Sequence, residues 1–309
     1  MPRFDVTIAG ELNLDLILYG LPEQLQPERE LLADRMMLTL GSSSAIVAHN
    51  LSALGSRVGF QSRIGDDPLG QIALERLKQG NVDVSKIRVV PGATTTGLTV
   101  ILHQQHWRNI LTYSGTIAEL AWEDLDLDYL ADSRHFHFSS YYLQKSLRPR
   151  VAELFQFLKS KGLTISLDTN DDPDDRWEGG LQQLLRHVDI FLPNEREACK
   201  AAGTENLEEA IKILSQLAPL VVVKLGRKGA LAQRGSDRFT AASKEVVPVD
   251  SVGAGDSFDA GFLHEYVRGS DLNKCLASGN AAGALSTTRP GGTEAFRDAQ
   301  HRDNFLRAK

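Results

Sequence analysis

The sequence predicts an α/β fold in which helices cover both faces of a mostly parallel sheet. Two observations predict it: strand-like and helix-like runs alternate along most of the 309 residues, and a 42% hydrophobic share is ample for a buried core. A third observation is that four short strand-like runs stand outside this alternation. We expect one domain over residues 1–309, with a small β-sheet lid formed by about 12–40 and 95–113.

The elements of the body follow in order from their periodicity and from their end signals. Strand-like runs cover residues 4–9, 58–64, 135–139, 163–168, 189–192, 220–224 and 230–234. Helix-like runs cover residues 44–54, 68–79, 149–161, 181–187, 195–202, 207–217, 257–268 and 271–287. Alternation of this kind is typical of βαβ units, whose right-handed crossovers give parallel strands.

The two regions that break the alternation contain short strands without a convincing helix between them. They are residues 14–19 and 30–40 in the first region, and residues 96–104 and 108–113 in the second. Because they are interleaved with the body, we interpret them as a lid. The alternative is that they extend the edge of the main sheet.

Charge and cysteine content exclude several classes of protein. A net charge of −6 argues against a nucleic-acid or membrane-surface partner. Cys199 and Cys275 form no CxxC pair, which argues against a zinc site or a disulfide scaffold. The first residues contain acids where a signal peptide needs an apolar core, so we expect a cytoplasmic protein.

The most informative stretch is residues 250–258, which read DSVGAGDSF. It follows an apolar, strand-like run (Val246, Val247, Val249) and precedes a helix-like segment. Glycines let the backbone approach a ligand, and the first N–H groups of a helix favour an anion. An acid among those donors suits the transfer of a phosphoryl group to an alcohol.

Three common motifs are absent from the sequence. It has no GxxxxGK[ST] of a P-loop, no GxGxxG after the first strand and no GxSxG nucleophile elbow. The ordered set of motifs that remains resembles the ribokinase-like carbohydrate kinase family, also called phosphofructokinase B, from about residue 6 to 292. The resemblance implies a three-layer α/β/α sandwich with a mostly parallel central sheet and a β-sheet lid. The signature matches residues 250–256, with Ser251 in place of threonine.

The resemblance gives the signature its catalytic roles. It implies that Asp256 is the general base, which takes the proton of the acceptor hydroxyl. The amides of Gly253, Ala254 and Gly255 would stabilise charge on the transferring group, together with that of Asp256. The alternative is a helix cap with an acid in its first turn.

The resemblance also implies ATP and Mg²⁺. Asn194 and Glu197 match an Asn-x-x-Glu motif that organises magnesium, largely through water. Without the other motifs, the same pattern is an ordinary helix capping box. Asp250, with nearby backbone carbonyls, is the expected contact for a monovalent cation such as K⁺.

The nucleotide is expected to lie along residues 222–229 (VVKLGRKG). Lys224 stands where the family has a hydroxyl residue, and it either neutralises a phosphate or points to solvent. Gly226 and Gly229 would let the backbone approach the nucleotide. Asn280 is placed near adenine, with a local hydrogen bond as the alternative.

Asn13 and Asp15 share a strand face because their spacing is two, and the resemblance implies that they bind sugar hydroxyls. Gly41 and Ser42 belong to the first family signature, in which Ser42 replaces a glycine and Ile46 replaces an asparagine. Ile46 therefore suggests an altered or less polar acceptor pocket.

Two further residues are expected near the acceptor. Arg108 lies in the lid, where it would meet a carboxylate or phosphate, an exposed arginine being the alternative. Asn170 follows a central strand at the carboxyl edge, where open α/β sheets bind ligands.

The predicted function is ATP-dependent phosphorylation of a hydroxyl of a small sugar or sugar acid, with CH₂OH as the expected attacking group. One alternative is a nucleoside kinase on the same fold, in which Ile46 and Phe60 would line a slot for the base. The other is a non-catalytic regulator that binds a sugar or a nucleotide. Family members often pair their lids, so a homodimer through the lid is a further expectation.

Overall fold

The computed structural model describes residues 2–92, 94–104 and 107–308. Its main sheet has nine strands in the order β13-β12-β11-β10-β9-β8-β1-β4-β5, parallel from β11 to β5 and antiparallel at β12 and β13. The strands are β1 (Phe4–Ala9), β4 (Val58–Gly65), β5 (Asp83–Val90), β8 (Ser133–Ser139), β9 (Thr164–Asp168), β10 (Ile190–Phe191), β11 (Leu220–Lys224), β12 (Ala230–Arg234) and β13 (Asp237–Ala241). The predicted mostly parallel sheet is therefore confirmed.

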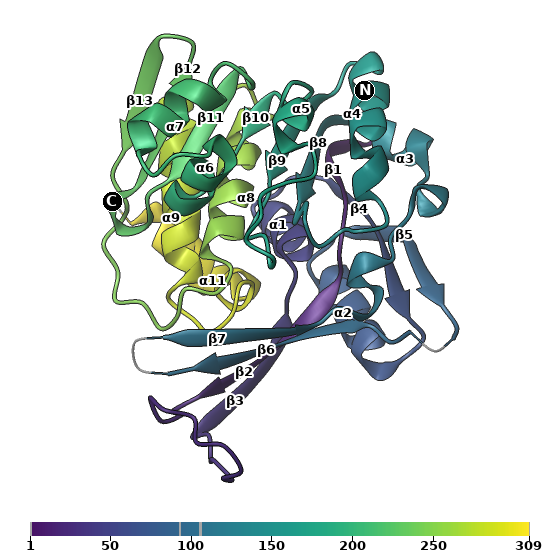
Figure 1. Ribbon diagram of the computed structural model, residues 1–309, viewed down its shortest axis with the longest axis vertical. Helices are drawn as coiled ribbons and strands as arrows, with labels where there is room; N and C mark the ends of the chain where they lie inside the picture. The colour runs from purple at the N-terminus through teal and green to yellow at the C-terminus, as the bar shows by residue number, and fades with distance from the viewer. Residues whose placement is uncertain (1, 93, 105–106, 309) are drawn as a thin grey trace.

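Helices cover both faces of this sheet and give three layers (Figure 1). One face carries α4 (Val151–Ser160), α5 (Leu181–Leu185), α6 (Glu195–Ala202) and α7 (Leu207–Leu214), and the other carries α1 (Ser43–Ala53), α2 (Pro68–Gln79), α8 (Ala254–Tyr266) and α9 (Leu272–Ser286). Each face has its own apolar core. Leu154 packs with Phe138 in the first core, and Leu51 and Phe262 pack with Ile8 in the second.

Three short helices complete the chain. They are α3 (Leu127–Ala131), which precedes β8, and α10 (Glu294–Arg297) and α11 (Ala299–Arg307), which follow α9. In the described ranges, no helix combines the length and the apolar character that crossing a membrane requires.

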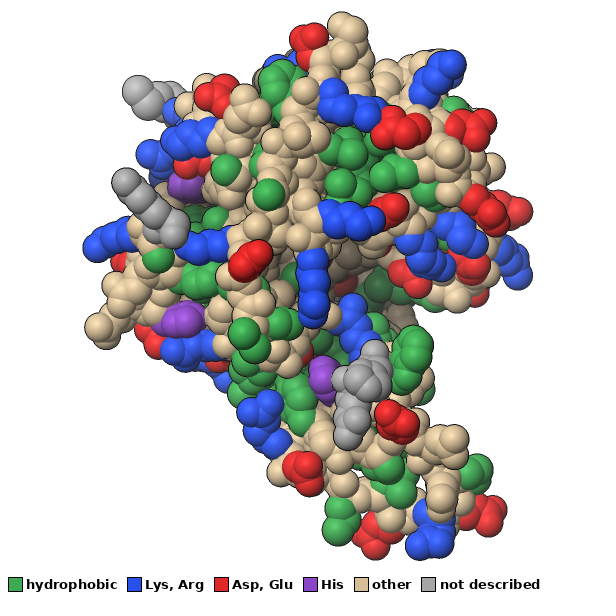
Figure 2. All heavy atoms as spheres, turned by 90° about the vertical axis from the view of Figure 1, so that its left-hand side faces the viewer, with side chains coloured by type: hydrophobic (Ala, Val, Ile, Leu, Met, Phe, Trp, Pro, Cys, Tyr) green, Lys and Arg blue, Asp and Glu red, His purple; other side chains and the backbone are tan. Residues whose placement is uncertain are grey.

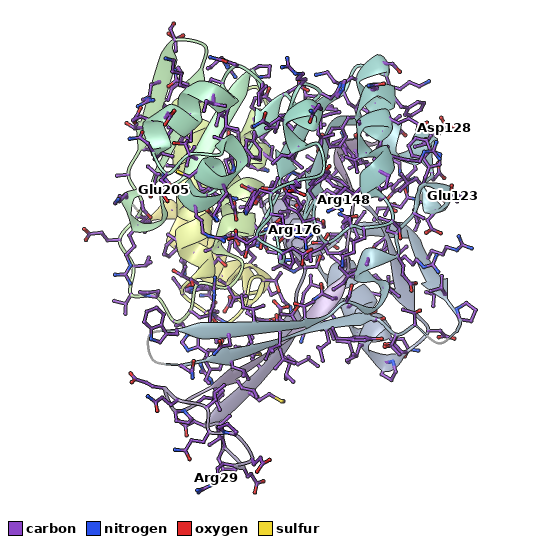
Figure 3. All side chains as sticks on the ribbon, viewed as in Figure 1. Arg29, Glu123, Asp128, Arg148, Arg176 and Glu205 are labelled. Atoms are coloured by element: carbon purple, nitrogen blue, oxygen red, sulfur yellow. The ribbon has the colours of Figure 1, made fainter. Side chains whose placement is uncertain are left out.

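The four extra strands form a separate sheet in the order β3-β2-β6-β7. They are β2 (Asn13–Tyr19), β3 (Arg35–Leu40), β6 (Gly97–His103) and β7 (Arg108–Tyr113). Figure 1 shows this sheet lying across the lower end of the body, and in Figure 3 Arg29 marks its outer tip. The small-sheet lid is confirmed, and the alternative of an extended main sheet is wrong.

Several helices begin and end at the residues that their capping signals indicate. The side chain of Asp67 accepts hydrogen bonds from the N–H groups of Leu69 and Gly70, Pro68 occupies the first turn, and Gly80 follows the last residue of α2. Because these signals lie within a few residues of the helix end, the predicted helix over 68–79 has the observed bounds.

Several features differ from the prediction, among them the helices α3, α10 and α11, which the sequence analysis did not predict. The run from Val246 to Val249 is not a strand, since no neighbouring strand pairs with it and the side chain of Val247 is 91% exposed. In the lid, β3 begins only at Arg35, although the N–H of Asp34 already donates to Tyr19 O at 2.8 Å. The helix that follows the signature turn, α8, starts at Ala254 and not at residue 257. Edge strands β5 and β13 were not predicted, because half-exposed strands carry no apolar run.

Candidate active site

The signature residues form the turn that opens α8. Gly253 caps the helix with φ of +69°, and a Cβ added there would lie 2.5 Å from the Cα of Gly292. Only glycine fits both the dihedral angle and the contact. Within the described ranges, no acceptor is hydrogen-bonded to the N–H groups of Gly253, Gly255 or Asp256. The turn therefore presents free donors, as an anion site requires.

Asp256 is buried in the first turn of α8. Burial and the negative charge of Asp168 raise the pKa of Asp256, while Lys224 and the side chains of Ser43 and Asn170 act in the opposite direction. A carboxylate with a raised pKa is a better proton acceptor than an exposed one. The position and environment of Asp256 fit a general base.

Lys224 lies inside the site, neither free nor in solvent. Its Nζ is 2.6 Å from Asp168 Oδ2 and 3.2 Å from Asp259 Oδ2. Burial disfavours the ammonium, but the charges of Asp168 and Asp259 more than offset this effect and raise the pKa of Lys224. The lysine is therefore permanently charged and is held by two carboxyl groups.

Asn194 and Glu197 form the capping box of α6. The Asn194 side chain accepts the Glu197 N–H at 2.9 Å, and Glu197 Oε2 accepts the Asn194 N–H at 2.8 Å. Glu197 Oε1 accepts no hydrogen bond from the described residues, and burial with the nearby charge of Asp168 raises the pKa of Glu197 to about 7. The pair thus caps α6 and leaves Glu197 Oε1 available, which fits a water-mediated contact to Mg²⁺.

Asn13 and Asp15 lie together on the body-facing side of β2. A Cβ added to Gly41 would lie 2.2 Å from Asp15 Oδ1 and 2.9 Å from Asn13 Nδ2. Asp15 is 6% exposed and forms no hydrogen bond with the described residues. Burial and then the charge of Asp256 raise the pKa of Asp15 to about 7. A buried carboxyl group without a protein partner is suited to bind hydroxyl groups.

Asn170 joins three segments at the carboxyl edge of the sheet. Its Nδ2 donates to Ser43 Oγ at 2.8 Å, and its Oδ1 accepts the Ser140 N–H at 3.0 Å. Both functional groups of the Asn170 side chain are therefore engaged by the protein. Its role next to Asp256 is to hold Ser43 and Ser140 in place.

Ser42 caps α1 with φ of +68°, a dihedral angle that favours glycine. Its hydroxyl donates to Glu11 O at 2.5 Å and accepts the Ala45 N–H at 3.1 Å. Only the backbone of Ser42 is thus left for an acceptor contact. Ile46 is 3% exposed and packs on Gly253 and Gly292, so it supports the signature turn instead of lining a pocket.

The lid contacts the signature turn directly. Arg108 Nη1 donates to Ser251 Oγ at 3.0 Å, and the positive charge of Arg108 partly offsets the raised pKa of Asp15. Figure 2 shows the lid projecting from the body, with an indentation of the surface between the two. The Arg108–Ser251 hydrogen bond therefore links the lid to the signature turn.

Asp250 accepts hydrogen bonds on both carboxylate oxygens. Oδ1 accepts the Val252 N–H at 2.9 Å, and Oδ2 accepts Tyr19 Oη at 2.5 Å and the Gly291 N–H at 3.1 Å. These contacts anchor the signature loop to β2. Asp250 is therefore engaged by the protein, and the nearby carbonyl groups of Val252, Thr287 and Gly292 also accept hydrogen bonds.

On the predicted nucleotide side, Gly226 and Gly229 differ. A Cβ on Gly226 would meet open space, which leaves room for a ligand, whereas one on Gly229 would lie 2.0 Å from Ala241 O. Asn280 Nδ2 donates to Ala241 O at 2.9 Å and to Ala242 O at 3.2 Å. Gly229 and Asn280 thus hold the segment after β13, the local role that was the alternative for Asn280.

Two residues outside the predicted set complete the site. Glu11 is buried and accepts hydrogen bonds from Ser44 Oγ and Ser140 Oγ, which ties the segment after β1 to α1 and to the residue that follows β8. Asp259 is fully buried beside Lys224. Its place three residues after Asp256, on the same face of α8, is the one sequence signal for it.

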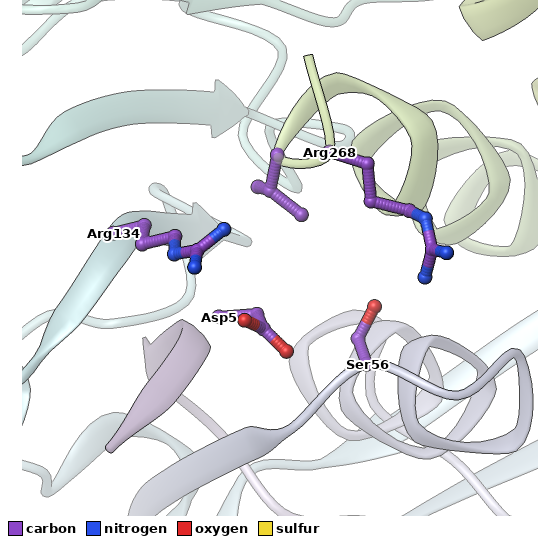
Figure 4. Close-up of a pocket in the computed structure, with 5 residues that line it drawn as sticks. Asp5, Ser56, Arg134 and Arg268 are labelled. Atoms are coloured by element: carbon purple, nitrogen blue, oxygen red, sulfur yellow. The ribbon is translucent and has the colours of Figure 1, made fainter. Parts of the chain in front are cut away.

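A cavity of about 320 Å³ lies elsewhere in the molecule. Figure 4 shows Arg134 and Arg268 on opposite sides of it, with Asp5 and Ser56 between them. Asp5 and Arg134 stand at the amino ends of β1 and β8, so this cavity is at the opposite edge of the sheet from Asp256. It takes no part in the site described above.

The model of the pfkB family of carbohydrate kinases matches residues 3–299. The chain belongs to this family. A 2-dehydro-3-deoxygluconokinase of Bacillus subtilis is 28% identical over 87% of each chain, and a cytidine kinase of Thermococcus kodakarensis is 29% identical over 89% of this chain and 93% of its own. A putative ribokinase II of E. coli, solved with ATP and Mg²⁺, superimposes with a TM-score of 0.84 at 25% identity, over 98% of this chain and 99% of its own. The family and the ribokinase-like fold are confirmed.

Proposed function

We propose that this protein transfers the γ-phosphoryl group of ATP to a hydroxyl, of the CH₂OH type, on a small sugar or sugar acid. One observation carries the proposal: the buried base Asp256, the free N–H groups of the α8 turn and the unpartnered carboxyl group of Asp15 converge at one edge of the sheet. The kinase relatives, among them the 2-dehydro-3-deoxygluconokinase, support the same reaction class.

The reaction follows from the geometry of the turn. Asp256 accepts the hydroxyl proton while the hydroxyl oxygen bonds to the γ-phosphorus and the bond to the β–γ bridging oxygen breaks. The free N–H groups of Gly253, Gly255 and Asp256 stabilise negative charge on the transferring group, whereas the N–H of Ala254 donates to Ser251 O at 3.4 Å. Asp15 and Asn13 hold neighbouring hydroxyl groups of the acceptor, so the attacking oxygen is fixed next to Asp256.

Magnesium and the nucleotide have compatible residues. Glu197 and Asn194 would hold Mg²⁺ through water, and the metal neutralises phosphate charge when it is bound. The nucleotide would run past Lys224 and the open space at Gly226. The ATP and Mg²⁺ of the E. coli ribokinase II structure support this assignment. A K⁺ ion at the loop carbonyls and a cytoplasmic location belong to the same proposal.

A coupled assay of ADP release, with mass spectrometry of the product, tests the proposal across pentoses, hexoses, 2-keto-3-deoxy sugar acids and nucleosides, each with and without K⁺. We expect one sugar or sugar-acid class to be phosphorylated. A nucleoside product would favour the second candidate, which the cytidine kinase relative supports but which Phe60 does not, because it is fully buried in the core. No phosphorylated product with any acceptor would favour the non-catalytic role.

The proposal includes a homodimer through the lid. Strand pairing aligns Leu38, Leu16, Val100 and Leu111 in one row across all four lid strands. Successive residues alternate between faces, so this row lies on the face opposite Asp15 and Asn13. Leu111 is 55% exposed and the neighbouring Met36 is 62% exposed. An exposed apolar sheet face of this kind is suited to pair with its copy.

A further inference from the structure

The site gathers four carboxyl groups in one small region. Asp168, Asp256, Asp259 and Glu197 are all buried around the start of α8 and the ends of β9 and β11. A nucleotide triphosphate would add further negative charge to the same place. Like charges at short range in a poorly hydrated site repel strongly, so nucleotide binding requires a compensating cation.

Lys224 is the cation that acts on all four of these carboxyl groups. Its side chain is 10% exposed, and its shortest contact is the 2.6 Å ion pair with Asp168, which is itself 2% exposed. Its Nζ also lies 3.5 Å from the place where a Cβ of Gly255 would stand. The ammonium therefore lies against the turn whose N–H groups face the phosphates, and Asp168 holds it there.

The contacts of Lys224, Asp168 and Asp259 indicate which of the three side chains are charged. Asp168 accepts from Lys224 through Oδ2 and from the Asn170 N–H through Oδ1, so both of its oxygens are engaged as a carboxylate would be. Burial favours the neutral form of Asp259 and raises its pKa well above the ordinary value. Lys224 and Asp168 thus form a neutral pair, with the positive end toward Gly255 and the negative end away from it.

We propose that the Lys224–Asp168 pair is an electrostatic positioning device for the nucleotide: Asp168 fixes the Lys224 ammonium beneath the phosphate-binding turn, with the positive end of the pair toward the phosphates. Lys224 acts through the electrostatic potential that it creates at the turn, because its ammonium is held in a fixed position at the end of β11. This inference rests on the proposed function, because it assumes that the α8 turn receives nucleotide phosphates.

The role predicts opposite effects from the two partners. Lys224→Met removes the cation and leaves the carboxyl groups uncompensated, so the Kd of the magnesium complex of adenylyl imidodiphosphate should rise by about 30-fold or more. Asp168→Asn keeps an oxygen for the Asn170 N–H and leaves the cation uncancelled, so the Kd should stay equal or fall. The double variant restores neutrality, and its Kd should return to within about threefold of wild type.

Isothermal titration calorimetry on the full chain measures these affinities, with thermal unfolding as the check of folding. Lys159→Met is the matched control, because Lys159 pairs with Asp189 at 2.7 Å on the surface away from the turn. Its Kd should equal that of wild type. If Lys224→Met does not fold, Lys224→Gln replaces it, since Gln keeps an N–H donor without the charge.

Two outcomes would overturn the inference: wild-type affinity in the Lys224 variant, or equal losses of affinity in the Lys224 and Asp168 single variants with no recovery in the double variant. The second pattern is what a purely structural ion pair gives. Failure of the proposed function looks different, because a wild-type protein that binds the nucleotide but phosphorylates no acceptor leaves this test intact. A wild-type protein that binds no nucleotide overturns both.

Discussion

At the scale of single residues, burial sets the chemistry of Asp256. The carboxyl group is enclosed beside Asp168, and both effects raise its pKa. Asp256→Asn keeps the shape and removes the proton acceptor, so kcat should fall by about 10³-fold or more. Calorimetric binding of the magnesium–nucleotide complex should persist. Near-normal turnover in this variant would contradict the assignment of Asp256 as the base.

We expect Asp15 to give the proposed acceptor site a pH dependence. Its pKa is raised to about 7 by burial and by Asp256, so it is protonated below that pH and ionised above it. An ionised acceptor binds hydroxyl donors more strongly, so acceptor affinity should rise as the pH rises through 7. Asp15→Asn should abolish this rise of affinity with pH and weaken acceptor binding by about 10- to 100-fold.

Calorimetric titration of the acceptor from pH 5.5 to 8.5 measures the effect without turnover. Asp256→Asn serves as a second test: the rise of affinity with pH should persist but move to lower pH, because the charge of Asp256 no longer raises the pKa of Asp15. A pH-independent acceptor affinity in wild type would show that Asp15 is not the titrating group.

At the scale of elements, side chains from two lid strands connect the lid to the signature turn: Tyr19 on β2 donates to Asp250, and Arg108 on β7 donates to Ser251. Arg108 on β7 reaches Ser251 in the signature turn at 3.0 Å. Arg108→Gln should loosen this link and admit water, so kcat for the acceptor should fall by about tenfold while acceptor-independent ATP hydrolysis rises.

Arg29→Gln is the control for this variant, because Arg29 is an exposed arginine at the outer tip of the lid (Figure 3). Measuring ADP release with and without acceptor compares the two variants. If they behave alike, the Arg108–Ser251 link has no part in closure.

At the scale of the whole molecule, the exposed lid face predicts assembly. Leu111→Asp places a charge in the apolar row and should convert a dimer to a monomer. Val247→Asp is the control, since Val247 is 91% exposed on the body. Sedimentation equilibrium of both variants and wild type measures the mass. A monomeric wild-type protein at micromolar concentration would contradict the lid dimer.

Most of the body was predictable because its signals are local. The strand over Leu220–Lys224 and the helix over Glu195–Ala202 have the predicted bounds, since an apolar run and a capping box lie within the elements themselves. Edge strands β5 and β13 were missed because edge strands need no continuous apolar face. The lid strands were predicted from the sequence. The face of each strand that meets the body, however, follows only from the pairing of β2 with β3 and β6.

The sequence by itself indicated the reaction class: the glycines and acid of the signature turn predict an anion site beside an acid, because a turn and a helix start are local structures, and the resemblance to the ribokinase-like family implies the kinase reaction. The tertiary structure decided which side chains are free to act. It engages Asn280, Ser42 and Asn170 with the protein, leaves Asp15 unpartnered, and sets Lys224 on Asp168, 56 residues away in the chain. Burial and charge depend on contacts between distant segments, and only the folded chain brings those segments together.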